Sequence, residues 1–242
     1  MKEIKIVYDF DGTLTDHVFP SYPVMKKLGI SIVDMIKNAK EFIKDKDQLV
    51  ERFMHIYIDL FHKKGLAPSY ENICLGAETI SFAEGVEEFF EAINKAAKFH
   101  QVKLEHYIIT SGMQEFLEKT KIAKYFTAIK GSSFLYNSSN EIIGVKEVVE
   151  AKDKVKKLLE INENSSNCTN IIYIGDGFTD FYSMNFVKEN HGISICVYDE
   201  NTRNDYLKLL EKNAIDEGFE RDYRVESDLY QFLKESIKKV GE

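Results

Sequence analysis

Two aspartates separated by one residue follow a short apolar segment near the start of the chain. Residues 4–8 are β-branched or aromatic except for one lysine, and they predict a buried strand. Asp9 and Asp11 come next, in the sequence DFDGT, and carboxylates two residues apart beyond a strand point the same way out of the turn. Two carboxylates directed at one place can bind a cation or transfer protons. The apolar strand and the Gly-Thr pair favour this functional interpretation over an ordinary solvated turn.

Two more polar turns follow apolar segments farther along the chain. Ser111 and Gly112 lie in the turn after the segment YII, and Asp176 and Asp180 belong to the sequence GDGFTD, which follows the segment IIYI. Apolar strands without alternation are typical of a parallel sheet covered on both faces, and ligands of such sheets gather at the carboxyl ends of the strands. We therefore expect the three turns to share one edge of the sheet, where a hydroxyl group, backbone amides and carboxylates converge.

These turns require a sheet whose strands alternate with helices. Helical stretches separate the apolar segments, two more strands are expected at residues 192–198 and 224–225, and a closing amphipathic helix is expected at residues 228–240. The predicted fold class is α/β, with a Rossmann-like parallel sheet as its core.

A segment of different character interrupts this order after the first turn. Residues 24–46 and 48–64 carry apolar side chains at helical spacing with lysines opposite, and the alternating pattern resumes only later. We therefore predict a core formed by residues 1–15 and 84–242 and an inserted, mainly helical cap domain at residues 16–83. The cap is expected to act as a lid over the shared edge of the sheet.

Composition limits the partners of the protein. The 242 residues include 32 Lys or Arg and 40 Asp or Glu, and the net charge of −8 argues against nucleic acid as a partner. The same charge repels phosphorylated ligands, so phosphate chemistry would need a metal ion and local cations. No window approaches the ~18 apolar residues of a membrane span and no signal-peptide segment is present, so we predict a cytoplasmic protein with no membrane partner. Three widely spaced cysteines predict neither a disulfide nor a zinc site.

Taken together, the motifs resemble those of the haloacid dehalogenase superfamily, and within it the phosphoserine-phosphatase-like branch, in which a helical cap is inserted after the first motif. The first motif is DFDGTLT, the second is Ser111 in IITSG, the third is a lysine in AKDKV, and the fourth is GDGFTD. The resemblance runs from residue 4 to about residue 225, and it covers the cap only in position and helical character.

The resemblance implies a role for each aspartate. It makes Asp9 the nucleophile, which forms an aspartyl-phosphate, and Asp11 the acid and base that serves first the leaving oxygen and then the attacking water. Mg²⁺ is the implied cofactor, and its implied ligands are Asp9, the backbone carbonyl of Asp11, and Asp176. Asp180 is implied to orient Asp176 or the waters of the metal from behind.

The resemblance also implies how the phosphoryl group is held. Ser111 and the amide of Gly112 are expected to hydrogen-bond it, and a lysine is expected to neutralise its remaining charge. We favour Lys152, because it opens the helix that precedes the strand of the fourth motif, as the third-motif lysine of the family does. Lys154 and Lys130 remain alternatives.

The implied function is a Mg²⁺-dependent phosphatase that acts on a small phosphorylated metabolite. Phosphoserine phosphatases carry a glutamate nine residues beyond the nucleophile for the substrate amine, and Val18 stands at that position here, which argues against phosphoserine itself. Two alternatives stay open: a phosphomutase or phosphotransferase that passes the aspartyl-phosphate to a hydroxyl group, and a non-catalytic binding module on the same fold. The presence of all four aspartates argues against the second.

Several cap side chains are candidates for lining the substrate pocket. They are Phe19, Tyr22, Arg52 and Tyr57. Aromatic residues at helical spacing more often pack in a core, and a lone arginine more often forms a surface ion pair. The sequence leaves a homodimer open.

Overall fold

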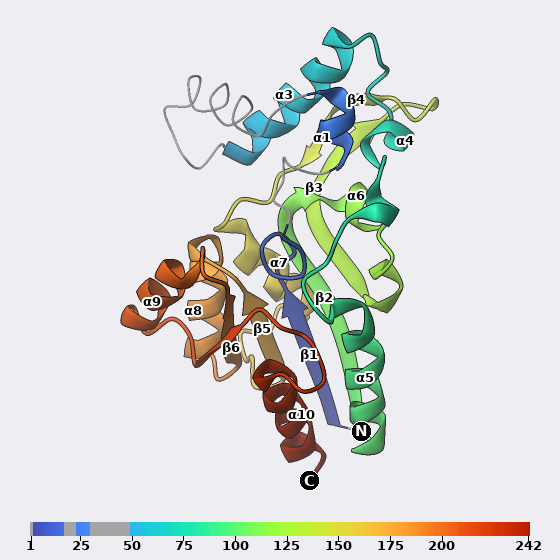
Figure 1. Ribbon diagram of the computed structural model, residues 1–242. Helices are drawn as coiled ribbons and strands as arrows, with labels where there is room; N and C mark the ends of the chain where they lie inside the picture. Colours follow the sequence, from blue (N-terminus) through green and yellow to red (C-terminus); the bar gives the residue numbers. More distant parts are fainter. Residues whose placement is uncertain (1, 17–22, 30–48) are drawn as a thin grey trace.

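The computed structural model describes residues 2–16, 23–29 and 49–242, and a seven-stranded sheet lies at the centre of the described part (Figure 1). The strands are β1 (Lys2–Tyr8), β2 (Val102–Met113), β3 (Ala128–Tyr136), β4 (Ile142–Glu147), β5 (Ile171–Gly175), β6 (Ile193–Tyr198) and β7 (Glu217–Glu220). Their order is β4-β3-β2-β1-β5-β6-β7, and neighbours are parallel except for β3 and β4, which pair antiparallel. The predicted α/β class with a Rossmann-like sheet is confirmed.

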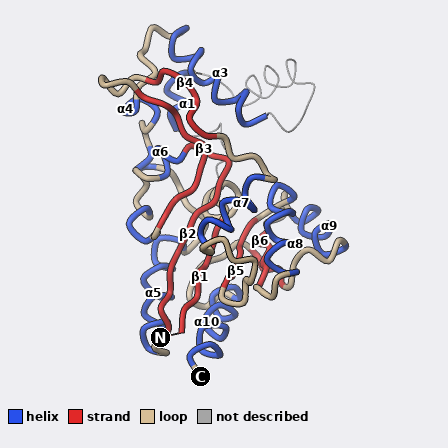
Figure 2. The backbone as a smooth tube through the Cα atoms, turned by 180° about the vertical axis from the view of Figure 1, so that it is seen from behind, coloured by secondary structure: helices blue, strands red, loops and turns tan. Residues whose placement is uncertain are grey.

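Helices cover both faces of the sheet. α5 (Val86–Phe99) and α10 (Asp228–Gly241) pack together on one face, against β2 and β1 respectively. α7 (Asp153–Ile161) and α8 (Phe181–Glu189) pack on the other face, as the two opposite views in Figures 1 and 2 show. α9 (Arg203–Glu211) lies against β6. The sheet is therefore buried on both sides, as its apolar strands without alternation predict.

The central strand β1 divides its side chains between the two cores. Ile4, Ile6 and Tyr8 enter the apolar cluster that includes residues of α5 and α10, whereas Val7 enters the cluster that includes residues of α7 and α8. All four are at most 2% exposed. Side chains of a strand alternate between its faces, so Asp9, two residues beyond Val7, leaves the strand on the side of α7.

Three details differ from the elements predicted from the sequence. β2 continues through Ser111 and Gly112 to Met113, so these residues belong to the end of a strand and not to a turn. The register between β2 and β3 shifts between Ile109 and Met113. The antiparallel hairpin of β3 and β4 was not predicted. The strand expected at residues 224–225 is wrong: the last strand is β7, and residues 224–225 lie in the loop before α10.

The insertion is helical where the structure describes it. Its elements are α1 (Pro23–Leu28), α3 (Leu49–Lys63), α4 (Tyr70–Ile73) and the 3₁₀ helix η2 (Ala77–Thr79). They lie beyond the end of the sheet near β4, far from both chain termini (Figure 1). Most of the helix predicted at residues 24–46 falls outside the described residues.

Backbone hydrogen bonds tie the end of the insertion to the tip of the hairpin. The amide of Tyr70 donates to the carbonyl oxygen of Asn140 at 3.0 Å, and the amide of Ile142 donates to that of Pro68 at 2.7 Å. At the start of α3, the amide of Val50 donates to Oε1 of Glu150 at 2.7 Å, and Glu150 lies in the loop before α7. The hairpin and this loop thus both help to hold the described part of the insertion.

Two expectations from composition can be compared with the described residues. None of their helices combines the length and the apolar character needed to cross a bilayer. The three cysteines, Cys74, Cys168 and Cys196, are free thiols in the structure.

His106, in β2, provides a test of this packing through the pH dependence of stability. Its ring is 2% exposed, with Nδ1 3.1 Å from the hydroxyl oxygen of Tyr8 and Nε2 3.2 Å from Oδ1 of Asn94. A neutral ring with its proton on Nε2 satisfies both partners. Burial lowers the pKa of His106 to about 4.

We expect acid to destabilise the protein through His106. A histidine in the unfolded chain titrates near pH 6.5. Between about pH 6.5 and pH 4 the unfolded chain therefore binds a proton that the native ring does not bind, so the free energy of unfolding falls as the pH falls. Denaturant unfolding at about pH 7 and pH 5 should show that wild type loses roughly 2 kcal/mol more than His106→Gln. The exposed His62 supplies the control, His62→Gln, which should behave as wild type. An equal loss in wild type and His106→Gln would contradict this account.

Candidate active site

Strand register brings the predicted polar segments to one edge of the sheet. Tyr8, the last residue of β1, pairs with Ile108 of β2 on one side and with Ile174 of β5 on the other. The amide of Asp9 continues this pairing by donating to the carbonyl oxygen of Ile174 at 2.8 Å. The turn after β1 therefore lies between the end of β2, which carries Ser111, and the turn after β5.

A buried lysine joins the first and fourth motifs. Nζ of Lys154 lies 2.9 Å from Oδ1 of Asp9 and 2.7 Å from Oδ1 of Asp180. The hydroxyl group of Tyr173, in β5, donates to the same Oδ1 of Asp180 at 2.8 Å. Asp9, Lys154 and Asp180 are 4%, 1% and 0% exposed, so water contributes little to their solvation. Burial opposes the charge of Lys154, but the carboxylates of Asp180 and Asp9 outweigh it and raise the pKa of this lysine well above its usual value.

The lysine beside Asp9 is Lys154, which corrects our preference for Lys152. Lys152 is exposed at the N-cap of α7. Lys130, the other alternative, is partly exposed, and its Nζ lies 3.8 Å from Oε2 of Glu160. Each residue of a helix is rotated by about 100° from the previous one, so a side chain two positions from Lys154 points nearly the opposite way. The inward face of α7 is formed by Lys154, Lys157, Leu158 and Ile161.

Three carboxylates gather within reach of a single cation. Asp9, Asp176 and Asp180 each offer an oxygen atom, and these atoms lie within 4.8 Å of one another. Burial, followed by the charge of Asp180, raises the pKa of Asp9 well above its usual value against the opposing effect of Lys154. Burial and the charge of Asp180 likewise raise the pKa of Asp176 to about 7. One lysine does not neutralise the cluster.

The cluster fits a hard divalent cation such as Mg²⁺. Its donors are carboxylate oxygens, which Mg²⁺ prefers, and its excess negative charge would be relieved by a cation. Oδ2 of Asp180 is buried and has no hydrogen-bond partner among the described residues, whereas Oδ1 is already bonded to Lys154 and Tyr173. Asp180 therefore lies beside Asp9 and Asp176.

Gly12 packs the turn of the first motif directly against Asp176. Its φ angle is +73°, a backbone conformation that residues other than glycine rarely adopt. A Cβ atom at this position would lie 2.4 Å from Oδ2 of Asp176. The glycine of the DFDGT sequence is thus required both by backbone conformation and by space.

The predicted phosphate-binding residues lie at the same edge, at the end of β2. Ser111 is partly buried, and Gly112 is buried. The amide of Gly112 donates to Oγ1 of Thr110 at 2.9 Å, so this amide has a partner within the protein. Thr110 joins the site as a residue that the sequence did not single out.

The cap candidates are only partly within the described residues. Tyr57 is fully buried in the main apolar cluster, where its ring packs edge-to-face on Phe61 at 5.3 Å, so it does not line an open pocket. Arg52 is partly buried in the first turns of α3. Phe19, Tyr22 and Val18 lie outside the described residues.

Two more residues near the site were missed from the sequence. Tyr173 stands within an apolar strand and was counted only as an apolar residue. Arg221 lies 209 positions from Gly12, yet its Nη1 donates to the carbonyl oxygen of Gly12 at 2.6 Å. Periodicity carries no signal for a contact between such distant parts of a chain.

Comparison of the sequence with known proteins finds little. No protein-family model matches the chain. A protein from Borreliella burgdorferi, itself uncharacterized, is 25% identical, and the match covers 97% of this chain and 96% of that protein.

Comparison of the structure finds similar solved proteins. A HAD family hydrolase from Salmonella enterica serovar Typhi matches with a TM-score of 0.61 at 15% identity, over 93% of this chain and 71% of that one. A phosphoserine phosphatase solved as an analogue of its phospho-aspartyl intermediate matches with a TM-score of 0.59 at 16% identity, over 97% and 99% of the chains. A substrate-bound phosphoserine phosphatase matches with a TM-score of 0.60 at 15% identity, over 97% and 99%. Together with the sheet order and the helical insertion, these matches show that the chain has the haloacid dehalogenase fold in its phosphoserine-phosphatase-like form.

Proposed function

We propose that the protein is a cytoplasmic, Mg²⁺-dependent phosphatase that hydrolyses a small phosphorylated metabolite through an aspartyl-phosphate on Asp9. The observation that carries the proposal is the position of Asp9. It is buried at the carboxyl end of the central strand, 2.9 Å from Lys154 and within 4.8 Å of two further carboxylates. A fold shared with phosphatases supports the reaction class.

In the proposed first step, a carboxylate oxygen of Asp9 attacks phosphorus and the bond from phosphorus to the ester oxygen breaks. Asp11 gives its proton to the departing oxygen, so the alcohol leaves neutral. Lys154 keeps the Asp9 oxygen oriented and offsets negative charge on the phosphoryl oxygens. Ser111, near the end of β2, would hydrogen-bond those phosphoryl oxygens.

In the second step, water attacks the phosphorus of the aspartyl-phosphate and gives a proton to Asp11. Inorganic phosphate leaves, and the carboxylate of Asp9 and the acid form of Asp11 are restored. Asp9 and Asp176, with the backbone carbonyl of Asp11, would hold the cation, and Asp180 would fix Lys154 beside it. When bound, Mg²⁺ supplies the positive charge that lets a carboxylate approach a phosphate dianion.

Replacing the nucleophile tests the proposal. Asp9→Asn keeps the size of the side chain but removes its negative charge, so turnover of p-nitrophenyl phosphate with Mg²⁺ should fall by at least about 1,000-fold. Asp205→Asn is the matched control, because Asp205 is a half-exposed aspartate paired with Lys208 on α9. Asp205→Asn should retain wild-type turnover. Retention of more than a few per cent of activity in folded Asp9→Asn would refute Asp9 as the nucleophile.

Metal removal tests the carboxylate cluster in two ways. EDTA should abolish turnover, and Ca²⁺ should restore it poorly because its larger and looser coordination shell misplaces the attacking carboxylate. Independently of activity, Mg²⁺ at about 100 times its dissociation constant should stabilise the wild type by roughly 2.7 kcal/mol in thermal or denaturant unfolding. Asp176→Asn should lose most of that stabilisation. Full activity in EDTA, or equal stabilisation of Asp176→Asn, would argue against this metal site.

A further inference from the structure

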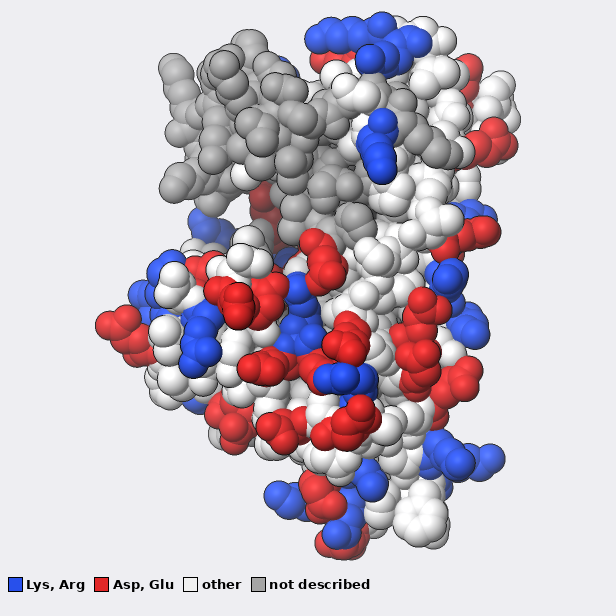
Figure 3. Space-filling view, in the orientation of Figure 1, with Lys and Arg blue, Asp and Glu red and all other residues white. Residues whose placement is uncertain are grey.

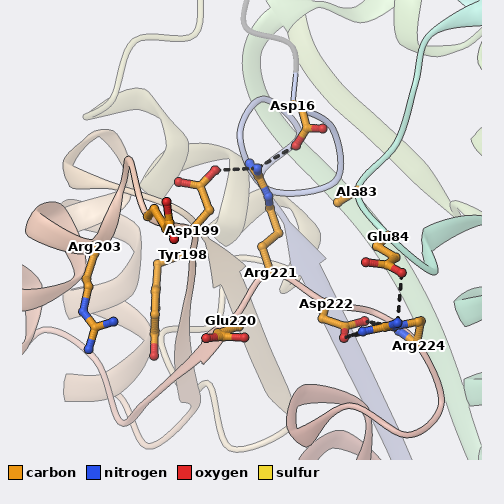
Figure 4. A pocket seen from close by; sticks show the side chains of 11 residues that line it. Asp16, Ala83, Glu84, Tyr198, Asp199, Arg203, Glu220, Arg221, Asp222 and Arg224 are labelled. Carbon is orange, nitrogen blue, oxygen red and sulfur yellow. Dashed lines mark hydrogen bonds and ion pairs between the residues drawn. The ribbon is translucent and has the colours of Figure 1, made fainter.

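Arg221, directly after β7, joins three distant segments of the chain. Its backbone amide donates to the carbonyl oxygen of Tyr198 at 2.8 Å. Its Nη1 donates to the carbonyl oxygen of Gly12 at 2.6 Å, and its Nη2 lies 2.6 Å from Oδ1 of Asp16 and 2.7 Å from Oδ2 of Asp199 (Figure 4). The side chain is only 11% exposed. Four polar contacts therefore fix this residue.

Asp199, the acidic partner of Arg221 after β6, is itself held by hydrogen bonds. Oδ1 of Asp199 accepts the amides of Asn201 at 2.7 Å and Thr202 at 3.0 Å, so the carboxylate is held by the loop that follows β6. Its other oxygen, Oδ2, accepts from Arg221. Arg221 is thus held both by its backbone amide and by an ion pair with a carboxylate that the loop orients.

The partners on the other side belong to the turn of the first motif. The carbonyl group of Gly12 is separated from Asp11 by a single peptide unit, in a backbone conformation with φ of +73°. Asp16 stands at the end of the same turn, with a side chain that is 62% exposed. Arg221 therefore contacts the turn both beside Asp11 and at its far end, and an arginine can do so because its planar group carries several fixed donors.

A second arginine near the turn makes different contacts. Arg224 lines the same cavity of about 490 Å³ as Arg221. On the face of the molecule seen in Figure 3, acidic and basic side chains are interleaved over the described residues. The Arg224 side chain is 47% exposed and forms ion pairs with Glu84, Asp222 and Glu226, which all lie outside the turn. Arg224 has the same charge and the same neighbourhood without a contact to the first motif, which makes it a matched control.

We propose that Arg221 is a positioning residue that fixes the Gly12 peptide and, through it, the direction of the Asp11 carboxyl group. The inference rests on the proposed function, in which Asp11 protonates the leaving oxygen. Loss of Arg221 should then harm the proton transfer and not the grip on the phosphoryl group, which belongs to Lys154 and the end of β2.

The leaving group distinguishes this role from a merely structural one. An alkoxide needs a proton in order to leave, whereas p-nitrophenolate leaves as a stable anion, so only alkyl esters depend strongly on the acid. Arg221→Gln should lower kcat/KM, which reports only the first step, about 100-fold for the alkyl monoester that wild type hydrolyses fastest, but less than about 5-fold for p-nitrophenyl phosphate. Any loss in the second step is common to both esters and does not enter this ratio. Arg221→Lys, which keeps the charge but not the fork of donors, should recover part of the loss.

The experiment measures kcat and KM of wild type, Arg221→Gln, Arg221→Lys and Arg224→Gln on both esters, together with amide hydrogen exchange of the peptide covering residues 9–16. We expect faster exchange in that peptide for Arg221→Gln only, and wild-type kinetics for Arg224→Gln. Equal losses of kcat/KM on both esters, or equal effects of the two glutamine variants, would overturn the proposal. If Arg221→Gln does not fold, Arg221→Lys carries the comparison. If wild type hydrolyses neither ester, the proposed function fails, and unchanged exchange at residues 9–16 would overturn the role of Arg221 separately.

Discussion

One lysine held between two buried carboxylates is the interaction on which this site depends. Moving charged groups out of water is costly, and only close pairing with good geometry offsets the cost. Lys154 meets this condition with Asp9 and Asp180, from a helix, a strand end and a turn that are distant in the chain. Asp176 adds a further negative charge that the lysine does not neutralise. The charge at this edge of the sheet therefore fits a cation.

The surrounding structure can be understood as support for this arrangement. β1 lies between β2 and β5, which sets Asp9 beside both polar segments. Tyr173 gives Asp180 a second donor, and Gly12 allows the first turn to touch Asp176 without a steric clash. Arg221, in the loop that follows β7, donates a hydrogen bond to the carbonyl oxygen of Gly12 in that turn. The described part of the insertion is hydrogen-bonded to the β3–β4 hairpin.

The parts of the fold that local pattern determines could be predicted from the sequence. β1 and β5 are apolar runs that end in polar turns, and the insertion shows helical spacing, so the sheet, the motifs and the helical character were accessible. The choice between Lys152 and Lys154 was accessible in principle, because Lys154 and Lys157 fall on the apolar stripe of α7, where a lysine needs an acidic partner. The spacing of the motif alone led to the wrong lysine. The contact of Arg221 with Gly12 was not accessible, since contacts between remote segments leave no periodic signal. The β3–β4 hairpin is a local pairing, and the polar residues 137–141 between two apolar runs were a turn signal that our prediction did not use.

The central claim is that Asp9 carries the phosphoryl group and that Lys154 makes this possible. The most direct measurement is a rapid acid quench of enzyme mixed with p-nitrophenyl phosphate and Mg²⁺, followed by mass analysis of the peptide that contains Asp9. The account predicts a phosphoryl group on Asp9 in wild type and in Lys152→Met, and none in Lys154→Met that is still folded with Mg²⁺ bound. Phosphorylation at another residue, or its loss in Lys152→Met with retention in Lys154→Met, would contradict the account.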